Sequence, residues 1–203
     1  MTAERPRALL VDYGCVISRA QPQQAIAEMA SVAELDVDEF VARYWEHRVA
    51  YDRGLDAGTY WSTVLGNGPP DQRSLERLVR LDVASWGILN AGTLEILTAA
   101  HRDGIALSLL SNAPYELADA LDGHRALALF DHLVFSARIG AVKPEPAAFA
   151  AALEVMSLRP DDVVFIDDRQ ENVEGAIACG LRGILFSSAD QLREVLALHG
   201  WSG

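Results

Sequence analysis

The sequence predicts an α/β protein in which helices cover both faces of a parallel sheet, with a small four-helix bundle inserted after the first strand. Two short apolar runs, at 9–11 and 163–166, end in carboxylates, as buried strands do at the ligand crevice of an open α/β sheet. From residue 91 onward, strand and helix patterns alternate, which favours parallel pairing. Between the first strand and residue 91 only helical patterns occur, and these predict the inserted bundle.

The inserted segment contains four expected helices, at 21–35, 36–51, 56–65 and 71–81. Asp36 is a suitable N-cap for the second helix and Gly54 ends it. The Gly-Asn-Gly-Pro-Pro loop at 66–70 closes the third helix. We therefore expect residues 18–90 to form a helical domain, and residues 1–17 together with 91–203 to form the α/β core.

The second part of the chain is expected to alternate between helices and strands. Pro114 and Pro144 each begin a helix, because proline is favoured at the first helical position. The remaining helices are expected at 93–102, 170–179 and 189–198, and Gly180 ends the second of these. The strands are expected at 105–110, 132–136, 163–166 and 183–186.

Composition narrows the class of protein. The 203 residues carry a formal net charge of −12, and half of them are hydrophobic, which is ordinary for a globular protein. The acidity argues against nucleic acid as a partner, because phosphate backbones bind basic surfaces. No apolar run approaches the roughly 18 residues of a membrane span, and no secretory signal is recognisable. The two cysteines, Cys15 and Cys179, are expected as reduced thiols, which favours a cytoplasmic protein. We expect a monomer or homodimer with no membrane partner.

Four polar segments lie at or near the ends of the expected strands. Asp12 and Gly14 follow the first strand, Ser111-Asn112 follows the strand at 105–110, and Asp167-Asp168 follows the strand at 163–166. Lys143 lies just before a helix. Three carboxylates delivered in this way suit a hard cation such as Mg²⁺, which prefers oxygen ligands.

Taken in order, these segments resemble the haloacid dehalogenase-like hydrolase superfamily, specifically its phosphatase branch with a small helical cap on a Rossmann-like core. The stretches that carry the resemblance are Leu-Ser-Asn-Ala at 110–113, Val-Lys-Pro-Glu-Pro at 142–146 and Phe-Ile-Asp-Asp-Arg-Gln-Glu-Asn-Val-Glu-Gly-Ala at 165–176. The resemblance covers essentially the whole chain, and the helical insertion corresponds to the cap. The implied activity is Mg²⁺-dependent hydrolysis of a small phosphorylated metabolite, with sugar phosphates favoured.

The resemblance also implies roles for single residues. Asp12 would attack phosphorus, form an aspartyl-phosphate and contribute an oxygen to Mg²⁺. The Gly14 carbonyl and Asp168 would be further metal ligands, and Asp167 would hold metal-bound water. Residues expected to bind the phosphoryl group or neutralise its charge are Ser111, the backbone around Asn112, and Lys143. Asn172 would orient the loop that carries the acid pair.

One position departs from the family pattern. Phosphatases of this family usually carry a second aspartate two residues after the nucleophile, as general acid and base, whereas this chain has Gly14. General acid–base help is worth about 10²–10⁴-fold in rate. Three interpretations stay open: a slow or selective phosphatase, a 2-haloacid dehalogenase whose halide leaves without a proton, and a phosphate-ligand-binding or interaction protein without turnover. The retained acid pair and Lys143 favour the first.

The cap offers candidates for substrate recognition. His47 and Tyr51 are four residues apart and share one helix face, and Arg48 and Asp52 share the adjacent face. We expect His47, Arg48 and Tyr51 to contact the substrate, the alternative being a solvated polar face. The aromatic side chains of Tyr44, Trp45, Tyr60 and Trp61 are expected in the core of the bundle.

Overall fold

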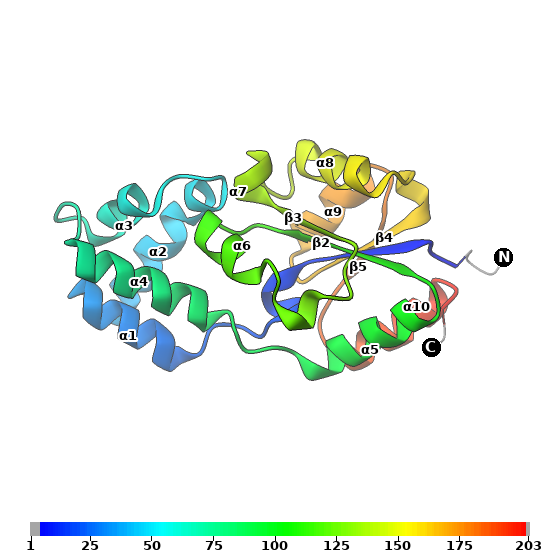
Figure 1. The fold of residues 1–203 in the computed structure, drawn as a ribbon, viewed down its shortest axis with the longest axis horizontal. Coiled ribbons are helices and arrows are strands. Elements are labelled where there is room, and N and C mark those ends of the chain that lie inside the picture. The colour runs from blue at the N-terminus through cyan, green and yellow to red at the C-terminus, as the bar shows by residue number, and fades with distance from the viewer. Residues whose placement is uncertain (1–4, 202–203) are drawn as a thin grey trace.

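The structure is a computed structural model that describes residues 5–201, so the outermost residues of the expected 1–17 and 91–203 core lie outside it. Its centre is a five-stranded parallel sheet with strand order β3-β2-β1-β4-β5 (Figure 1). The strands are β1 (Ala8–Val11), β2 (Ala106–Ser111), β3 (His132–Phe135), β4 (Val163–Asp167) and β5 (Arg182–Leu185). The α/β fold class that the sequence predicts is confirmed.

Alternate residues of the strands face two separate apolar layers. Leu9 and Val11 pack with helices α5 (Ala91–Arg102), α6 (Tyr115–Leu121) and α10 (Ala189–Leu198). Leu10 and Phe165 pack with α8 (Pro146–Met156) and α9 (Gln170–Ala178) on the other face. Figure 1 shows α8 and α9 above the sheet and α5 and α10 below it. Burial on both faces explains why the strands are continuous apolar runs.

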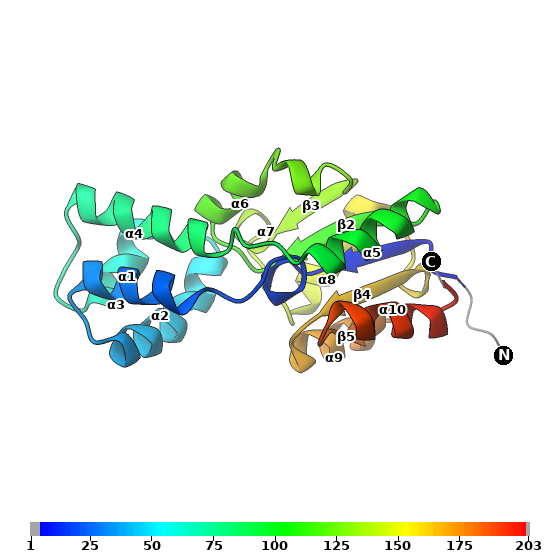
Figure 2. The ribbon, with the colours of Figure 1, turned by 90° about the horizontal axis from the view of Figure 1, so that it is seen from below.

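The insertion consists of α1 (Gln23–Ala33), α2 (Val37–Asp52), α3 (Ala57–Leu65) and α4 (Gln72–Ser85). These four helices pack around their own apolar cluster, whose largest members are Trp61, Tyr44, Tyr51, Tyr60 and Phe40. Tyr44, Tyr60 and Trp61 therefore lie in the bundle core as expected, whereas Trp45 is 47% exposed. The bundle, called the cap below, lies beyond one end of the sheet, and one chain segment leads into it and another out of it (Figure 2). We retain residues 18–90 as its proposed extent.

Several element boundaries differ from the sequence predictions. The helix expected from Pro144 begins at Pro146, because the Asn112 side chain bonds both the N–H and the C=O of Lys143 and holds that segment in the loop. A short helix, α7 (Ser136–Ile139), replaces the expected end of the strand at 132–136. An irregular turn, Tyr13–Ile17, follows β1 and contains Cys15 at a φ of 57°. Within residues 5–201, no helix is long and apolar enough to cross a membrane.

Candidate active site

Three carboxylates meet where β1 and β4 end. The two strands are paired in parallel with Val11 opposite Ile166, so the residues that follow, Asp12 and Asp167, are neighbours. The Asp12 backbone N–H also donates to the Ile166 carbonyl at 2.9 Å. Asp12, Asp167 and Asp168 each offer an oxygen, and these oxygens lie within 4.8 Å of one another. The topology thus brings Asp12 together with two carboxylates, Asp167 and Asp168, that lie 155 or more residues further along the chain.

Lys143 completes this cluster from the loop before α8. Its Nζ donates to Asp12 Oδ1 at 2.6 Å and to Asp167 Oδ2 at 2.7 Å, and the residue is only 4% exposed. The ammonium group is therefore a fixed positive charge between two carboxylates. A buried Lys is charged only when it is paired in this way.

The cluster holds more negative than positive groups. Burial, together with repulsion from Asp167 and Asp168, raises the pKa of Asp12 to about 7, although Lys143 opposes the rise. Burial and the Asp167 charge also raise the pKa of Asp168. Burial works against the charge of Lys143, but Asp12 and Asp167 outweigh it and raise the pKa of the ammonium. A cation would relieve the remaining repulsion, and an all-oxygen donor set fits a hard ion such as Mg²⁺.

Hydrogen bonds fix the orientation of Asp167. Asn172 Nδ2 donates to both of its carboxylate oxygens, at 3.0 and 3.1 Å, and the Arg169 backbone N–H donates to Oδ1 at 2.9 Å. Asp167 is fully buried, so these donors replace the solvent that a carboxylate needs. This agrees with the expected orienting role of Asn172.

The loop after β2 reaches the same cluster. Ser111 is the last residue of β2 and is 3% exposed, next to Asn112. The Asn112 side chain accepts from the Lys143 backbone N–H at 2.8 Å and donates to the Lys143 carbonyl at 3.0 Å. Asn112 therefore positions Lys143 through its side chain, which leaves its backbone as the part proposed to bind a phosphoryl group. Ser111 remains a proposed phosphoryl ligand.

Gly14 lies next to the aromatic ring of Trp86. Its φ of −62° is available to any residue. A Cβ placed there would lie 3.6 Å from Trp86 Cζ3 and 3.9 Å from Asp12 Oδ2, which is ordinary contact. The neighbouring Cys15 is a poor nucleophile, because burial and Asp168 raise the pKa of its thiol to about 11. The Gly14 carbonyl remains a proposed metal ligand.

The structure changes the interpretation of the cap residues. Arg48 is 4% exposed and is paired with Asp52 Oδ1 at 2.8 Å and with both oxygens of Asp82 at 3.0–3.1 Å. The Arg48 guanidinium is therefore already bound inside the cap, and contact of Arg48 or Tyr51 with the substrate stays a proposal. Tyr51 is buried and donates its hydroxyl to Glu116 Oε2 of the core at 2.9 Å.

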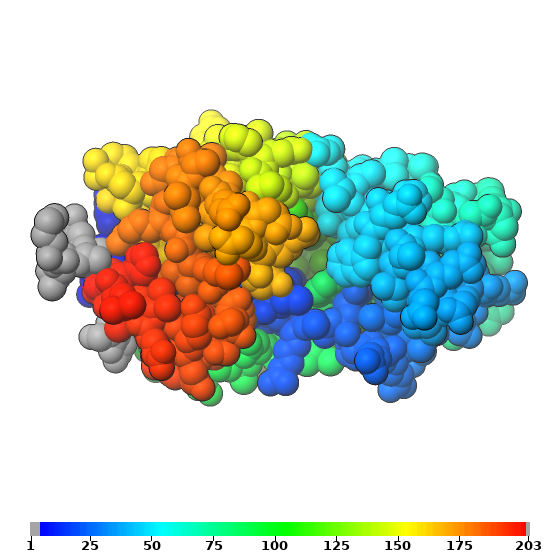
Figure 3. Space-filling model, turned by 180° about the vertical axis from the view of Figure 1, so that it is seen from behind, coloured from blue at the N-terminus to red at the C-terminus, as the bar shows by residue number. Residues whose placement is uncertain are grey.

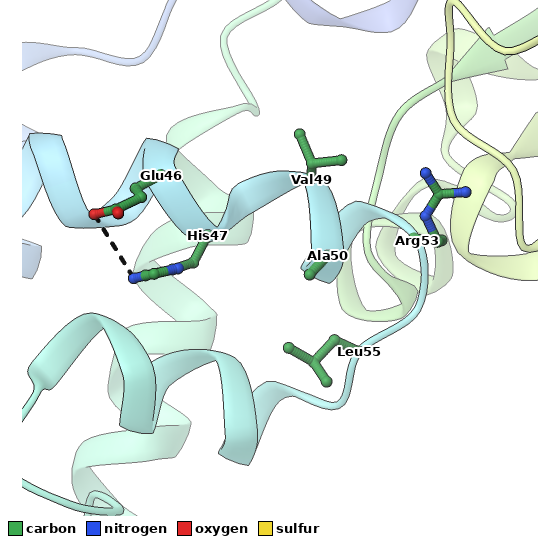
Figure 4. Close-up of a pocket in the computed structure, with 6 residues that line it drawn as sticks. All are labelled: Glu46, His47, Val49, Ala50, Arg53 and Leu55. Carbon is green, nitrogen blue, oxygen red and sulfur yellow. Dashed lines mark ion pairs between the residues drawn. The ribbon is translucent and has the colours of Figure 1, made fainter.

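His47 lies at a surface hollow of the cap. Glu46, His47, Val49, Ala50, Arg53 and Leu55 line the hollow, which Figure 4 shows between α2 and the start of α3. His47 Nε2 lies 3.9 Å from Glu46 Oε2. No contact of His47 with the acid cluster is found within residues 5–201, so its role in substrate binding stays a proposal.

The chain shares sequence with known hydrolases. A model of the haloacid dehalogenase-like hydrolases matches residues 7–180. The phosphatase MT3486 of Mycobacterium tuberculosis is 31% identical over 196 residues, which are 92% of this chain and 90% of the relative. The bifunctional epoxide hydrolase 2 of Mus musculus is 27% identical over 145 residues, 68% of this chain. The chain spans 26% of that enzyme's length.

Solved structures share the fold. A HAD family enzyme from Bacteroides thetaiotaomicron, in complex with magnesium and inorganic phosphate, has a TM-score of 0.73 at 18% identity, covering 90% of this chain and 95% of that chain. The L-2-haloacid dehalogenase RSc1362 has a TM-score of 0.72 at 16% identity, covering 98% and 100%. At these identities the likeness shows the fold alone, and a fold does not fix the reaction, so the residues of the site must distinguish phosphate-ester hydrolysis from dehalogenation.

Proposed function

The chain belongs to the haloacid dehalogenase-like hydrolase family, and on that premise we propose that it is a Mg²⁺-dependent phosphomonoester hydrolase. The proposed substrate is a small phosphorylated metabolite, with sugar phosphates as the leading class. The observation that carries the proposal is the Lys143 ammonium bound to Asp12 and Asp167 within a cluster that also includes Asp168. We further propose a cytoplasmic location and a monomeric or homodimeric state.

Each residue of the cluster has a proposed task. Asp12 attacks the phosphorus atom, and the bond to the leaving oxygen breaks as the aspartyl-phosphate forms. Lys143 neutralises charge on Asp12 and on the transferring group, because its ammonium is held against that carboxylate. Ser111 and the backbone N–H groups around Asn112 bind the phosphoryl oxygens. Asp12, Asp167, Asp168 and the Gly14 carbonyl would hold Mg²⁺, which supplies the charge neutralisation that lets an anion approach an anion.

Phosphate release tests the proposal. Wild-type protein is incubated with a panel of sugar phosphates and p-nitrophenyl phosphate, with Mg²⁺ and with EDTA, and inorganic phosphate is measured. We expect release with Mg²⁺ only, and none from Asp12→Asn. Asp190→Asn is the matched control, because this aspartate is exposed on α10. Undiminished release by Asp12→Asn would refute the nucleophile.

The same samples distinguish the alternatives. A dehalogenase would release chloride from 2-chloropropionate regardless of EDTA, and a ligand-binding protein would bind a phosphate ester without releasing phosphate. Either result in place of phosphate release would overturn the proposed function. The acid pair Asp167-Asp168 favours the phosphatase, because the halide displaced by a dehalogenase needs neither a proton nor a metal.

A further inference from the structure

Three successive residues at the end of α2 contact three parts of the core. Tyr51 donates to Glu116 of α6 at 2.9 Å. The Asp52 carbonyl accepts from the Ser136 hydroxyl at the start of α7. Arg53 Nη1 donates to Glu145 Oε2, just before α8, at 2.8 Å. This end of α2 is therefore held against the core, and from behind Figure 3 shows a furrow between the side of the cap that includes α2 and the region around α9.

These contacts place Asp52 between two loops of the active site. Ser136 Oγ also accepts from the Ala113 backbone N–H at 2.9 Å, two residues beyond Ser111. Glu145, the partner of Arg53, lies two residues beyond Lys143. The Lys143 ammonium is close enough to lower the pKa of Asp52 electrostatically. The Asp52 backbone is thus joined to the Ser111 loop through Ser136, and the next residue, Arg53, is joined to the Lys143 loop through Glu145.

The Asp52 carboxyl group keeps one oxygen free of protein partners. Oδ1 accepts from Arg48 Nε at 2.8 Å, and within residues 5–201 no hydrogen bond to Oδ2 is found, although the residue is only 9% exposed. Arg48 is shared with the buried carboxylate of Asp82, so one guanidinium faces two acids.

The surroundings of Asp52 bring the pKa of its carboxyl group closer to neutral pH. Burial raises the pKa of Asp52 to about 6, with Arg48 and Lys143 opposing the rise and Asp82 adding to it. The neighbouring core element α6 contributes Glu116, which accepts from the Tyr51 hydroxyl. A carboxyl group that titrates close to neutral pH is suited to both giving and taking a proton.

We propose that Asp52, delivered by the cap, is the general acid and base of the reaction, the role for which Gly14 has no side chain. This inference rests on the proposed function. As Asp12 bonds to phosphorus, the bond from phosphorus to the leaving oxygen breaks, and that oxygen takes the proton of Asp52. Water then attacks the aspartyl-phosphate and gives a proton to Asp52, the bond from phosphorus to Asp12 breaks, and inorganic phosphate leaves.

The test compares leaving groups, because a good leaving group needs no proton. kcat/KM is measured for p-nitrophenyl phosphate and for the sugar phosphate that wild type hydrolyses fastest. We expect Asp52→Asn to lower kcat/KM by 10²-fold or more for the sugar phosphate and by less than about tenfold for the aryl ester. Asp52→Glu should have a kcat/KM for the sugar phosphate at least tenfold higher than that of Asp52→Asn.

Asp82→Asn is the matched control, because Asp82 is the other carboxylate that is paired with Arg48. It is expected to change both substrates by the same factor. An equal loss on both substrates for Asp52→Asn, or no loss on either, would overturn the inference, as would the same selectivity in Asp82→Asn. If Asp52→Asn does not fold, the wild-type rates decide: a steep fall of kcat/KM with leaving-group pKa would contradict a general acid. A wild type that releases no phosphate from any ester refutes the proposed function instead.

Discussion

Asp12→Asn is expected to stabilise the metal-free protein at pH 8 while abolishing turnover. The Asp12 carboxylate is buried and lies beside Asp167 and Asp168, and Lys143 is the cation bound to it. Burial and this repulsion raise its pKa from 3.8 to about 7. Asparagine has nearly the same shape without the charge, so it removes the repulsion and leaves the Lys143–Asp167 pair in place.

The sign and size of the effect follow from linkage. A folded-state pKa above the unfolded value means that the folded protein binds more protons between pH 4 and 7, so stability falls as the pH rises through that window. Each pKa unit is worth about 1.4 kcal/mol, and the difference between 3.8 and about 7 corresponds to about 4 kcal/mol once both states are ionised. Asparagine does not titrate, so the advantage of the variant is expected to be about 2 kcal/mol at pH 5 and about 4 kcal/mol at pH 8.

Urea unfolding in EDTA at pH 5, 6, 7 and 8 measures this advantage. Asp190→Asn serves as the control, because its exposed carboxylate should leave stability nearly unchanged at every pH. Mg²⁺ is expected to stabilise wild type more than Asp12→Asn, because the variant has lost an anionic ligand. An advantage of Asp12→Asn that does not grow with pH would refute the electrostatic description of the cluster.

Three further perturbations test other parts of the structure. Gly14→Asp should fold, because a Cβ there meets nothing closer than 3.6 Å, and it should raise kcat/KM for sugar phosphates at least tenfold in the Asp52→Asn background; no recovery in a folded double variant would contradict a missing proton donor. Arg48→Met should lower the free energy of unfolding by about 3–5 kcal/mol, because it leaves two buried carboxylates without their cation, and a loss below 1 kcal/mol in urea unfolding would refute that pairing. Arg53→Ala removes an ion pair that is about 40% exposed on each side and should leave the urea midpoint nearly unchanged, so a clear downward shift of the midpoint would contradict a solvent-screened pair.

The convergence of Asp12 and Asp167 could be predicted from the sequence. The runs at 9–11 and 163–166 are apolar throughout and are followed directly by Asp12 and Asp167. Parallel pairing places the carboxyl ends of such strands side by side, so their convergence follows from the topology. Lys143 was recognisable only from its sequence context, because its bonds to two strands depend on how Asn112 holds the loop.

The cap residues were harder to predict because their partners are distant in sequence. Helical spacing places Arg48 and Asp52 on one face, but it does not say whether that face is solvated or buried. The answer depends on Asp82, 34 residues away on α4, which accepts two hydrogen bonds from Arg48. The bond from the Ser136 hydroxyl to the Asp52 carbonyl likewise depends on a short helix, α7, that the sequence pattern did not predict.

The core and the cap carry two buried clusters of similar composition, one on each side of the boundary between them. Lys143 is bound to Asp12 and Asp167 in the core, and Arg48 is bound to Asp52 and Asp82 in the cap. Buried ion pairs of this kind contribute little to stability compared with apolar packing, so stability alone does not account for them. In each cluster carboxylates outnumber cations, and the excess negative charge is relieved either by a metal ion or by a retained proton. The core cluster has a third carboxylate, Asp168, in coordination reach, which suits a metal ion. Within residues 5–201 no such carboxylate group is found beside Asp52 and Asp82, so uptake of a proton is the remaining way to relieve the cap cluster.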